Sequence, residues 1–198
     1  MILDSSFWKN DLKKNIQLLK KINTKKITEK TSFELEKIFF ITAYIIRKLY
    51  QSGKLSNSIF KENIILNCFK PIKNINRMNW IFIDELYDLK NPQKCSRTLD
   101  YILNQLVHSY TFSYTFKENY KEIDMILFHS DKERNYNTYA IKLDEYIAIL
   151  ESVSNYNITS ATMTYDETEN DYILVVEGDE FKVNNVTDIP KIDAYDAL

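Results

Sequence analysis

The chain has 198 residues, of which 44% are hydrophobic and 27% charged, so it is long and apolar enough to bury a core of its own. It contains only two glycines, Gly53 and Gly178. A P-loop or a dinucleotide-binding turn needs several glycines so that the backbone can approach phosphate closely, and the sequence therefore excludes both nucleotide-binding classes.

The net charge of −2 conceals two unlike parts of the chain. Residues 1–80 carry 16 Lys and Arg against 6 Asp and Glu, whereas the remaining residues carry 10 against 22. The abundance of Lys, Asn, Ile and Tyr beside so little Gly is typical of an AT-rich genome. This composition is a matter of codons and is not evidence that the lysines serve binding. We expect a protein of a bacterial cell or of one of its mobile elements.

Cysteine usage and hydropathy indicate the compartment. Cys68 and Cys95 are too few for a disulfide framework and do not have the spacing of a zinc knuckle, so we expect two reduced thiols. Charged residues interrupt positions 1–19, where a signal peptide would be apolar. The longest apolar stretch, Ile38–Ile46, is far shorter than the ~20 residues of a membrane-spanning helix. The sequence predicts a cytoplasmic protein with no membrane partner.

The first predicted helix covers residues 5–23, with Asp4 or Ser5 as its N-cap. At 100° per residue, apolar side chains that include Phe7 and Trp8 separate from a face of lysines. The apolar face is expected to face a core and the lysine face solvent or an anionic partner. Residues 24–30 form a basic connector.

A second helix is predicted to begin at a capping box of Thr31 and Glu34 and to end at Gly53. Its middle, residues 38–46, is apolar on every side. A helix of that kind is normally surrounded by others, so we expect it to be the central core element.

The pattern is less regular between residues 58 and 110. A short helix is predicted for Ser58–Phe69, ended by Pro71, and another for Ser96–Tyr110 with Ser96 as N-cap. Residues 71–92 fit either a strand or a buried loop.

After residue 121 the apolar period shifts towards two, which is typical of strands. One predicted hairpin joins 123–129 to 138–143, a helix follows over 144–153, and a second hairpin joins 160–165 to 172–177. Residues 181–183 could add an edge strand, and 188–198 are expected to be a mobile tail. The second turn has Asp, Thr and Asn at the spacing of a calcium loop, but Asp171 stands where that loop needs glycine, so we interpret it as a hairpin turn.

These elements predict an α+β fold in which a helical N-terminal layer packs with a small antiparallel β portion. Residues 1–120 form the helical part, basic at its start, and residues 121–187 an acidic, β-rich part that shares its core. The later part is too short to build a substantial core alone.

Chemistry-bearing side chains gather on the predicted helix 96–110. Arg97, Asp100, Asn104 and His108 would form a polar stripe about 80° wide on an otherwise apolar helix. Unpaired buried polar groups are costly, so the stripe needs partners. It is either one wall of a polar cleft, with His108 as acid or base, or a hydrogen-bonded ladder that fixes the helix against its neighbour.

The segment Leu103-Asn104-Gln105-Leu106-Val107-His108 resembles the motif of HEPN-type helical domains, which include ribonucleases and nucleotide-binding modules. The polar residue of that motif falls on Asn104 and the histidine on His108, whereas the arginine position falls on Leu103. The resemblance implies a helical bundle that dimerises across this helix, with cleavage activity lost. It also implies an RNA-binding or RNA-cleaving alternative that uses His108 and Asn104.

Basic side chains could bind nucleic acid, with Phe7, Trp8 or Tyr50 stacking on bases. The same surface could equally meet the acidic part of a second copy. The candidate binding residues are Lys9, Lys13, Lys20, Lys21, Lys25, Lys26 and Arg97.

No convergent set of catalytic groups is recognisable, and we expect neither a cofactor nor a metal; two histidines cannot build a multi-histidine centre. The sequence therefore favours a non-catalytic binding or interaction protein that acts through charged surfaces on a protein partner or on itself.

Overall fold

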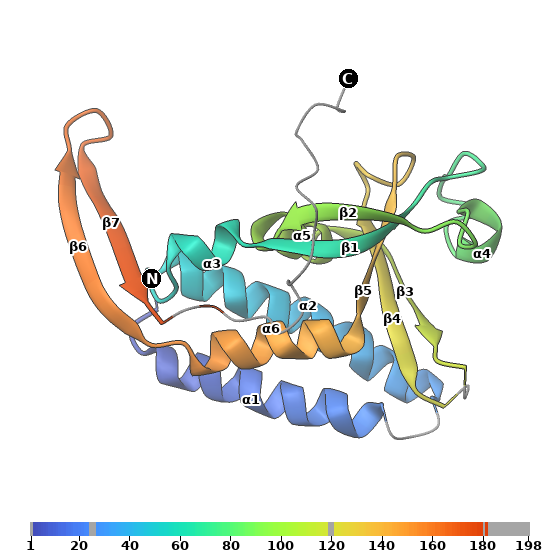
Figure 1. Cartoon of the computed structure of the whole chain (residues 1–198), viewed down its shortest axis with the longest axis horizontal. Helices are drawn as coiled ribbons and strands as arrows, with labels where there is room; N and C mark the ends of the chain where they lie inside the picture. Colours follow the sequence, from blue (N-terminus) through green and yellow to red (C-terminus); the bar gives the residue numbers. More distant parts are fainter. Residues whose placement is uncertain (1, 24–26, 119–120, 180, 182–198) are drawn as a thin grey trace.

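The computed structural model describes residues 2–23, 27–118, 121–179 and 181, and these form a five-stranded antiparallel sheet, a separate two-stranded sheet and six helices (Figure 1). The predicted α+β class is confirmed. Among the described residues, no helix has the length and apolar character needed to cross a membrane.

The main sheet has the strand order β2-β1-β5-β4-β3, and every neighbouring pair is antiparallel. Its strands are β1 (Asn63–Phe69), β2 (Gln93–Thr98), β3 (Ser109–Phe116), β4 (Ile123–Ser130) and β5 (Thr138–Lys142). The predicted hairpin of 123–129 with 138–143 is confirmed as β4 and β5. Three strands precede residue 120, so the sheet runs through the expected boundary between a helical and a β-rich part.

Two predicted helices are wrong over part of their length. The segment Ser58–Phe69 is split between a short helix, α3 (Asn57–Lys61), and strand β1. The predicted helix Ser96–Tyr110 is strand β2 up to Thr98 and helix α5 (Leu99–Val107) beyond it, capped by the Thr98 side chain. In both places, pairing of β1 with β2 along six residues outweighs the local helical pattern.

Helices cover one face of the sheet. Apolar side chains from α1 (Ser5–Ile22), α2 (Glu29–Gln51), α5 and α6 (Leu143–Asn155) form one large core with β1, β4 and β5. Helix α1 packs on α2 and α6, and α2 packs on α5. In Figure 1, α2 passes behind α6. The predicted helices 5–23 and 144–153 are confirmed as α1 and α6, with Asp4 as the N-cap of α1.

Helix α2 differs from its prediction at its start and around its middle. Its N-cap is Thr28, which exchanges hydrogen bonds with Thr31, so the predicted capping box of Thr31 with Glu34 is wrong. Its middle is not surrounded on every side: Phe39 is fully buried, whereas Ile41 and Tyr44 are exposed. One side of this central helix therefore faces solvent.

The opposite face of the sheet is covered by residues 70–92, which the sequence left ambiguous. This segment contains one short helix, α4 (Ile83–Leu86), and an isolated bridge between Pro71 and Tyr87. Ile75, Leu86 and Tyr87 pack with Leu127 and Ala140 of the sheet in a second, smaller core. The segment is thus an irregular apolar layer.

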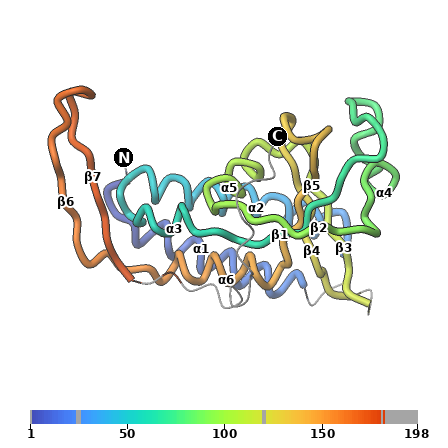
Figure 2. The backbone as a smooth tube through the Cα atoms, turned by 45° about the horizontal axis from the view of Figure 1, so that its top comes forward, coloured from blue at the N-terminus to red at the C-terminus, as the bar shows by residue number. Residues whose placement is uncertain are grey.

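The second predicted hairpin is confirmed as β6 (Ile158–Asp166) and β7 (Asp171–Gly178). Figures 1 and 2 show that it stands clear of the body of the molecule, and we call it the arm. The expected edge strand at 181–183 and the tail at 188–198 lie outside the described residues, apart from residue 181.

The expectation of two reduced thiols is wrong in this structure, because Cys68 and Cys95 form a disulfide. The register of β1 with β2 places Leu66 opposite Cys95, so Cys68 lies diagonally across from Cys95 at a Cα–Cα distance of 6.2 Å. Twenty-seven residues separate the two cysteines, so their proximity depends on strand pairing that local sequence patterns do not reveal.

The disulfide yields a stability prediction. A cross-link across a loop of this length restricts the unfolded chain, so replacing both cysteines by Ser should lower the free energy of unfolding by about 2–4 kcal/mol. Urea titration followed by circular dichroism measures the change, with reduced wild-type protein as the matched control. Equal midpoints for oxidised wild type and the Cys68→Ser, Cys95→Ser variant would contradict the prediction.

His129 on β4 gives a second prediction. It is 1% exposed and contacts the Thr138 hydroxyl at 3.2 Å; burial, helped by the nearby Arg134 charge, lowers its pKa to about 4. The unfolded chain binds a proton that the buried imidazole does not, so the free energy of unfolding should fall by up to about 3 kcal/mol as the pH drops from about 6.5 to 4.

Chemical unfolding at several pH values in this window tests the prediction for His129. The variant His129→Gln should lose most of this slope, whereas His108→Gln, at an exposed histidine, should keep it. The same slope in all three proteins would show that other groups cause the pH dependence.

Candidate interaction surface

His108 and Asn104 lie one helical turn apart at the end of α5. His108 is the C-cap residue, and its backbone N–H donates to the Asn104 carbonyl at 3.1 Å. The His108 side chain is exposed and that of Asn104 is half-buried. No described residue forms a side-chain hydrogen bond that orients the His108 imidazole. The structure therefore places the two residues near each other without building an acid–base arrangement around them.

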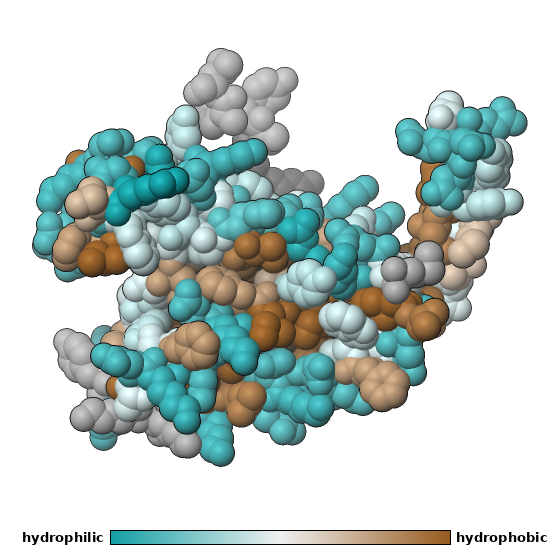
Figure 3. All heavy atoms as spheres, turned by 180° about the vertical axis from the view of Figure 1, so that it is seen from behind, coloured by the Kyte–Doolittle hydropathy of each residue, from teal (hydrophilic) through white to brown (hydrophobic). Residues whose placement is uncertain are grey.

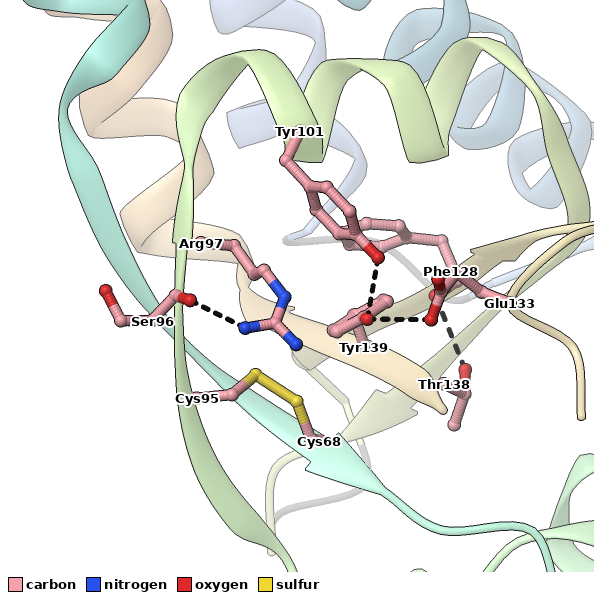
Figure 4. The surroundings of a disulfide bond; sticks show 9 residues. All are labelled: Cys68, Cys95, Ser96, Arg97, Tyr101, Phe128, Glu133, Thr138 and Tyr139. Atoms are coloured by element: carbon pink, nitrogen blue, oxygen red, sulfur yellow. Dashed lines mark hydrogen bonds between the residues drawn. A yellow bond between two sulfur atoms is a disulfide. The ribbon is translucent and has the colours of Figure 1, made fainter. Parts of the chain in front are cut away.

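Arg97 does not belong to the helix on which the sequence placed it. It lies on β2, so the predicted polar stripe of Arg97 with Asn104 and His108 on one helix is wrong. Its guanidinium lies over the rings of Tyr101 and Tyr139, at 5.4 and 5.7 Å from their centroids (Figure 4). It also donates to the Ser96 carbonyl at 2.9 Å.

The hydroxyls of the two tyrosines beside Arg97 belong to a series of side-chain hydrogen bonds that ends at Glu133. The hydroxyls of Tyr101 and Tyr139 are 2.8 Å apart, and Tyr139 donates to Glu133 Oε2 at 2.9 Å. Burial is the main cause that raises the pKa of both phenols, so both keep their protons at neutral pH. Figure 4 shows these hydrogen-bonded side chains next to the Cys68–Cys95 disulfide. Protonated phenols cannot act as bases, and the cluster joins the edge strand β2 to α5 and to the central strand β5.

Only some of the basic residues predicted to bind a partner lie close together on α1. Lys9, Lys13 and Lys20 line shallow hollows between α1 and the end of α6. Lys9 donates to the Tyr156 carbonyl, and Lys20 pairs with Glu151 at 2.7 Å. Lys21 is exposed on the same helix. Contacts within the protein therefore already occupy some of these α1 lysines.

The other residues predicted to bind nucleic acid do not complete this group. Lys25 and Lys26 lie outside the described residues, and Arg97 is on β2 rather than on α1. Phe7, expected to face the core, is exposed, whereas Trp8 packs against the core. Tyr50 is stacked on Phe60, with ring centroids 3.7 Å apart, and is not free to stack on a base.

The arm has two distinct faces. Residues directly opposite in an antiparallel pair share a face. The inner face, which turns towards the body at its base, is formed by the pairs Ala161–Val176, Met163–Leu174 and Tyr165–Tyr172. It is therefore apolar from base to tip.

The base of the arm is attached to the body at the turn between α2 and α3. Val176 is buried there, and Leu174 lies against Gly53. Asp179 fastens the base further by accepting hydrogen bonds from the backbone and side-chain nitrogens of Asn157, at 3.0 and 2.9 Å. A hollow of about 220 Å³ remains beside this contact, smaller than a typical small-molecule site.

The distal half of the arm is uncovered. The side chain of Met163 is 69% exposed and that of Tyr172 is 63% exposed. The rings of Tyr165 and Tyr172 make an edge-to-face contact, with their centroids 5.2 Å apart. Figure 3 shows the arm extending free of the body, with apolar side chains on the side that faces it. An isolated two-stranded hairpin is only marginally stable. Apolar side chains left exposed on such a hairpin are typical of a surface that contacts another molecule.

The arm is strongly acidic. Residues 158–179 contain six Asp and Glu and no Lys or Arg, and four of the acids lie at the tip: Asp166, Glu167, Glu169 and Asp171. Hydrogen bonds from the Thr168 side chain and backbone lower the pKa of Asp166 and hold the turn. Among the residues described, no three His, Cys, Asp or Glu are placed to bind a metal ion. The tip is therefore a negatively charged part of the surface.

The sequence predicted the hairpin but not its role as a surface. Two signals were present: apolar residues alternate along β6 and run without interruption over residues 172–176 of β7, and no basic residue interrupts the acids. Whether a hairpin packs on a core or projects from it depends on contacts with distant segments, and here the turn at Gly53 supports the base.

The geometry of α5 yields a prediction about RNA cleavage. Because the His108 imidazole is exposed and unoriented, we expect wild type and His108→Ala to give identical products from total RNA on a denaturing gel. His129→Gln serves as a second histidine control. Cleavage by wild type and His129→Gln that His108→Ala abolishes would contradict this and support the RNA-cleaving alternative.

Comparisons of the chain with models of protein families, with curated proteins and with solved structures found no match. The resemblance of residues 103–108 to HEPN-type domains is not tested by these comparisons and stays a prediction. The function of this chain has to be argued from its own geometry.

Proposed function

We propose that this chain is a non-catalytic interaction protein whose arm binds a protein surface that is both apolar and basic. The observation that carries the proposal is the uncovered distal half of the arm, where Met163, Tyr165 and Tyr172 lie beside four acidic residues. The body of the protein holds this hairpin away from its own core, in a position to contact another chain (Figure 1).

The apolar residues supply the favourable free energy of such a contact. Burying a large side chain contributes about 1.5–3 kcal/mol, and tyrosines are frequent anchors in protein interfaces because they lose little conformational entropy. Three such residues on one narrow face are enough for a moderate affinity once the cost of association is subtracted.

The acids determine which partner fits. Glu167 and Glu169 at the tip repel phosphate backbones, so the arm is unsuited to nucleic acid, and they attract lysines and arginines. The contact should therefore be specific for a basic surface and weaken as salt increases.

The expected cytoplasmic location stays a prediction. The disulfide between Cys68 and Cys95 bears on it, because disulfides persist in oxidising compartments and are rare in the cytosol.

Site-specific photo-crosslinking tests the proposed function. A benzophenone amino acid is placed at Met163 on the arm or, as the control, at Met78, an even more exposed methionine on the segment that covers the sheet. We expect a discrete protein adduct from position 163 in cells that make the chain, and no such adduct from position 78.

The charge of the tip supplies a second control. Glu167→Lys together with Glu169→Lys should abolish the adduct from position 163, because the reversed tip repels a basic partner. The proposal fails if position 163 gives no adduct, if position 78 gives the same one, or if the adduct survives the reversal.

A further inference from the structure

We infer that the partner of the arm is a second copy of this chain, and that the arm docks on the solvent-facing side of α2. This inference rests on the proposed function and names its partner. The docking surface, which we call the α2 stripe, consists of Lys30, Phe33, Lys37, Ile41, Tyr44 and Lys48.

The α2 stripe is a continuous surface on one side of the helix. Its members are three or four residues apart, so they fall within about 80° of one another around the helix axis. Phe33 is 62% exposed, and Ile41 and Tyr44 are exposed as well. Aromatic and branched apolar side chains thus alternate with lysines over five turns of a helix whose other side forms the core.

The lysines of the stripe have charge to offer. No ion pair joins Lys30 or Lys37 to any residue that the structure describes, and Lys48 lies over the ring of Tyr44 at 5.7 Å. This differs from α1, where Lys14 pairs with Asp11 and Lys20 with Glu151. The α2 stripe therefore combines exposed apolar side chains with lysines that have no ion pair among the described residues.

The distal arm and the α2 stripe are complementary in kind. Three large apolar side chains and four acids on the distal arm face three apolar side chains and three lysines on the stripe. Lys30 and Lys48 are about 27 Å apart along a helix, at ~1.5 Å per residue. The distal part of β6, residues 163–166, extends about 13 Å, at ~3.3 Å per residue, and so covers about half of the stripe.

One chain cannot make this contact with itself. The base of the arm is fixed at Gly53, just beyond the C-terminal end of α2, and the arm stands away from the body (Figures 1 and 2). Phe33 lies at the opposite end of the same helix. The stripe is therefore accessible to the arm of another molecule and not to its own.

Symmetry doubles the contact. If the arm of one copy lies on the stripe of a second copy, a two-fold axis brings the second arm onto the first stripe. Two reciprocal contacts bury twice the area of one, which brings the total closer to the ~1,200 Å² of a specific interface. We therefore expect a reversible dimer with a dissociation constant on the order of micromolar.

Sedimentation velocity of the full chain tests the inference. The mass should rise from the monomer value of 23.6 kDa towards twice that value as the concentration increases from about 1 to about 200 μM. The dimer should weaken between about 50 and about 500 mM salt because the contact is partly ionic.

Charge exchange makes the test specific. The arm variant, Glu167→Lys with Glu169→Lys, and the stripe variant, Lys30→Glu with Lys37→Glu, should each be monomeric. Mixed together, they should form a heterodimer, since each arm then meets a stripe of opposite charge. Lys90→Glu with Lys94→Glu, at exposed lysines outside both surfaces, changes the net charge of the chain as much as the stripe variant and should leave the dimer intact.

The outcomes separate this inference from the proposed function. A wild-type chain that stays monomeric, or a dimer that survives both charge reversals, overturns docking on the α2 stripe. If the photo-crosslink at Met163 then joins a different basic protein, the interaction function stands and only the identity of the partner is wrong. If no adduct forms either, both fail.

Discussion

The orientation of α2, which packs mainly on α1 and α5, is constrained by a buried contact with Tyr146 of α6. The rings of Phe39 and Tyr146 stack with centroids 4.2 Å apart, and the Tyr146 hydroxyl lies 2.8 Å from that of Thr42. Both hydroxyls are completely buried, and the hydrogen bond between them satisfies two polar groups that would destabilise the core if they were unpaired. This contact fixes which side of α2 faces inward. The direction of its exposed side and the place of Gly53 at its end follow from it.

The sequence predicted the elements whose pattern is local and missed those that depend on distant partners. Helix α1, helix α6 and both hairpins follow from a capping residue, a helical period or an alternation closed by a polar turn. Strand β1 could not be distinguished from a helix, because Ile64, Leu66 and Cys68 alternate in burial only once β2 and β5 lie on either side. The disulfide was missed for the same reason.

The candidate surface was predictable in its parts but not as a surface. The acidic turn and the apolar alternation of 160–177 were visible in the sequence, whereas the exposure of Met163 and Tyr172 depends on what the body leaves uncovered. Arg97 was misplaced because the chain changes from strand to helix at Thr98. The sequence favoured α1 as a binding surface because it contains many lysines. Lysines that already have partners contribute less to binding than the fewer lysines of the α2 stripe, which have no ion pair among the described residues.

Gly53 has a consequence for the seating of the arm. Its φ is +65°, and a β-carbon at this position would lie 2.1 Å from Leu174 Cδ2. Any side chain here would both strain the backbone and push against the root of the hairpin. The close seating of the hairpin on this turn therefore depends on one absent methyl group, and any substitution of Gly53 would force the Leu174 side chain off the turn.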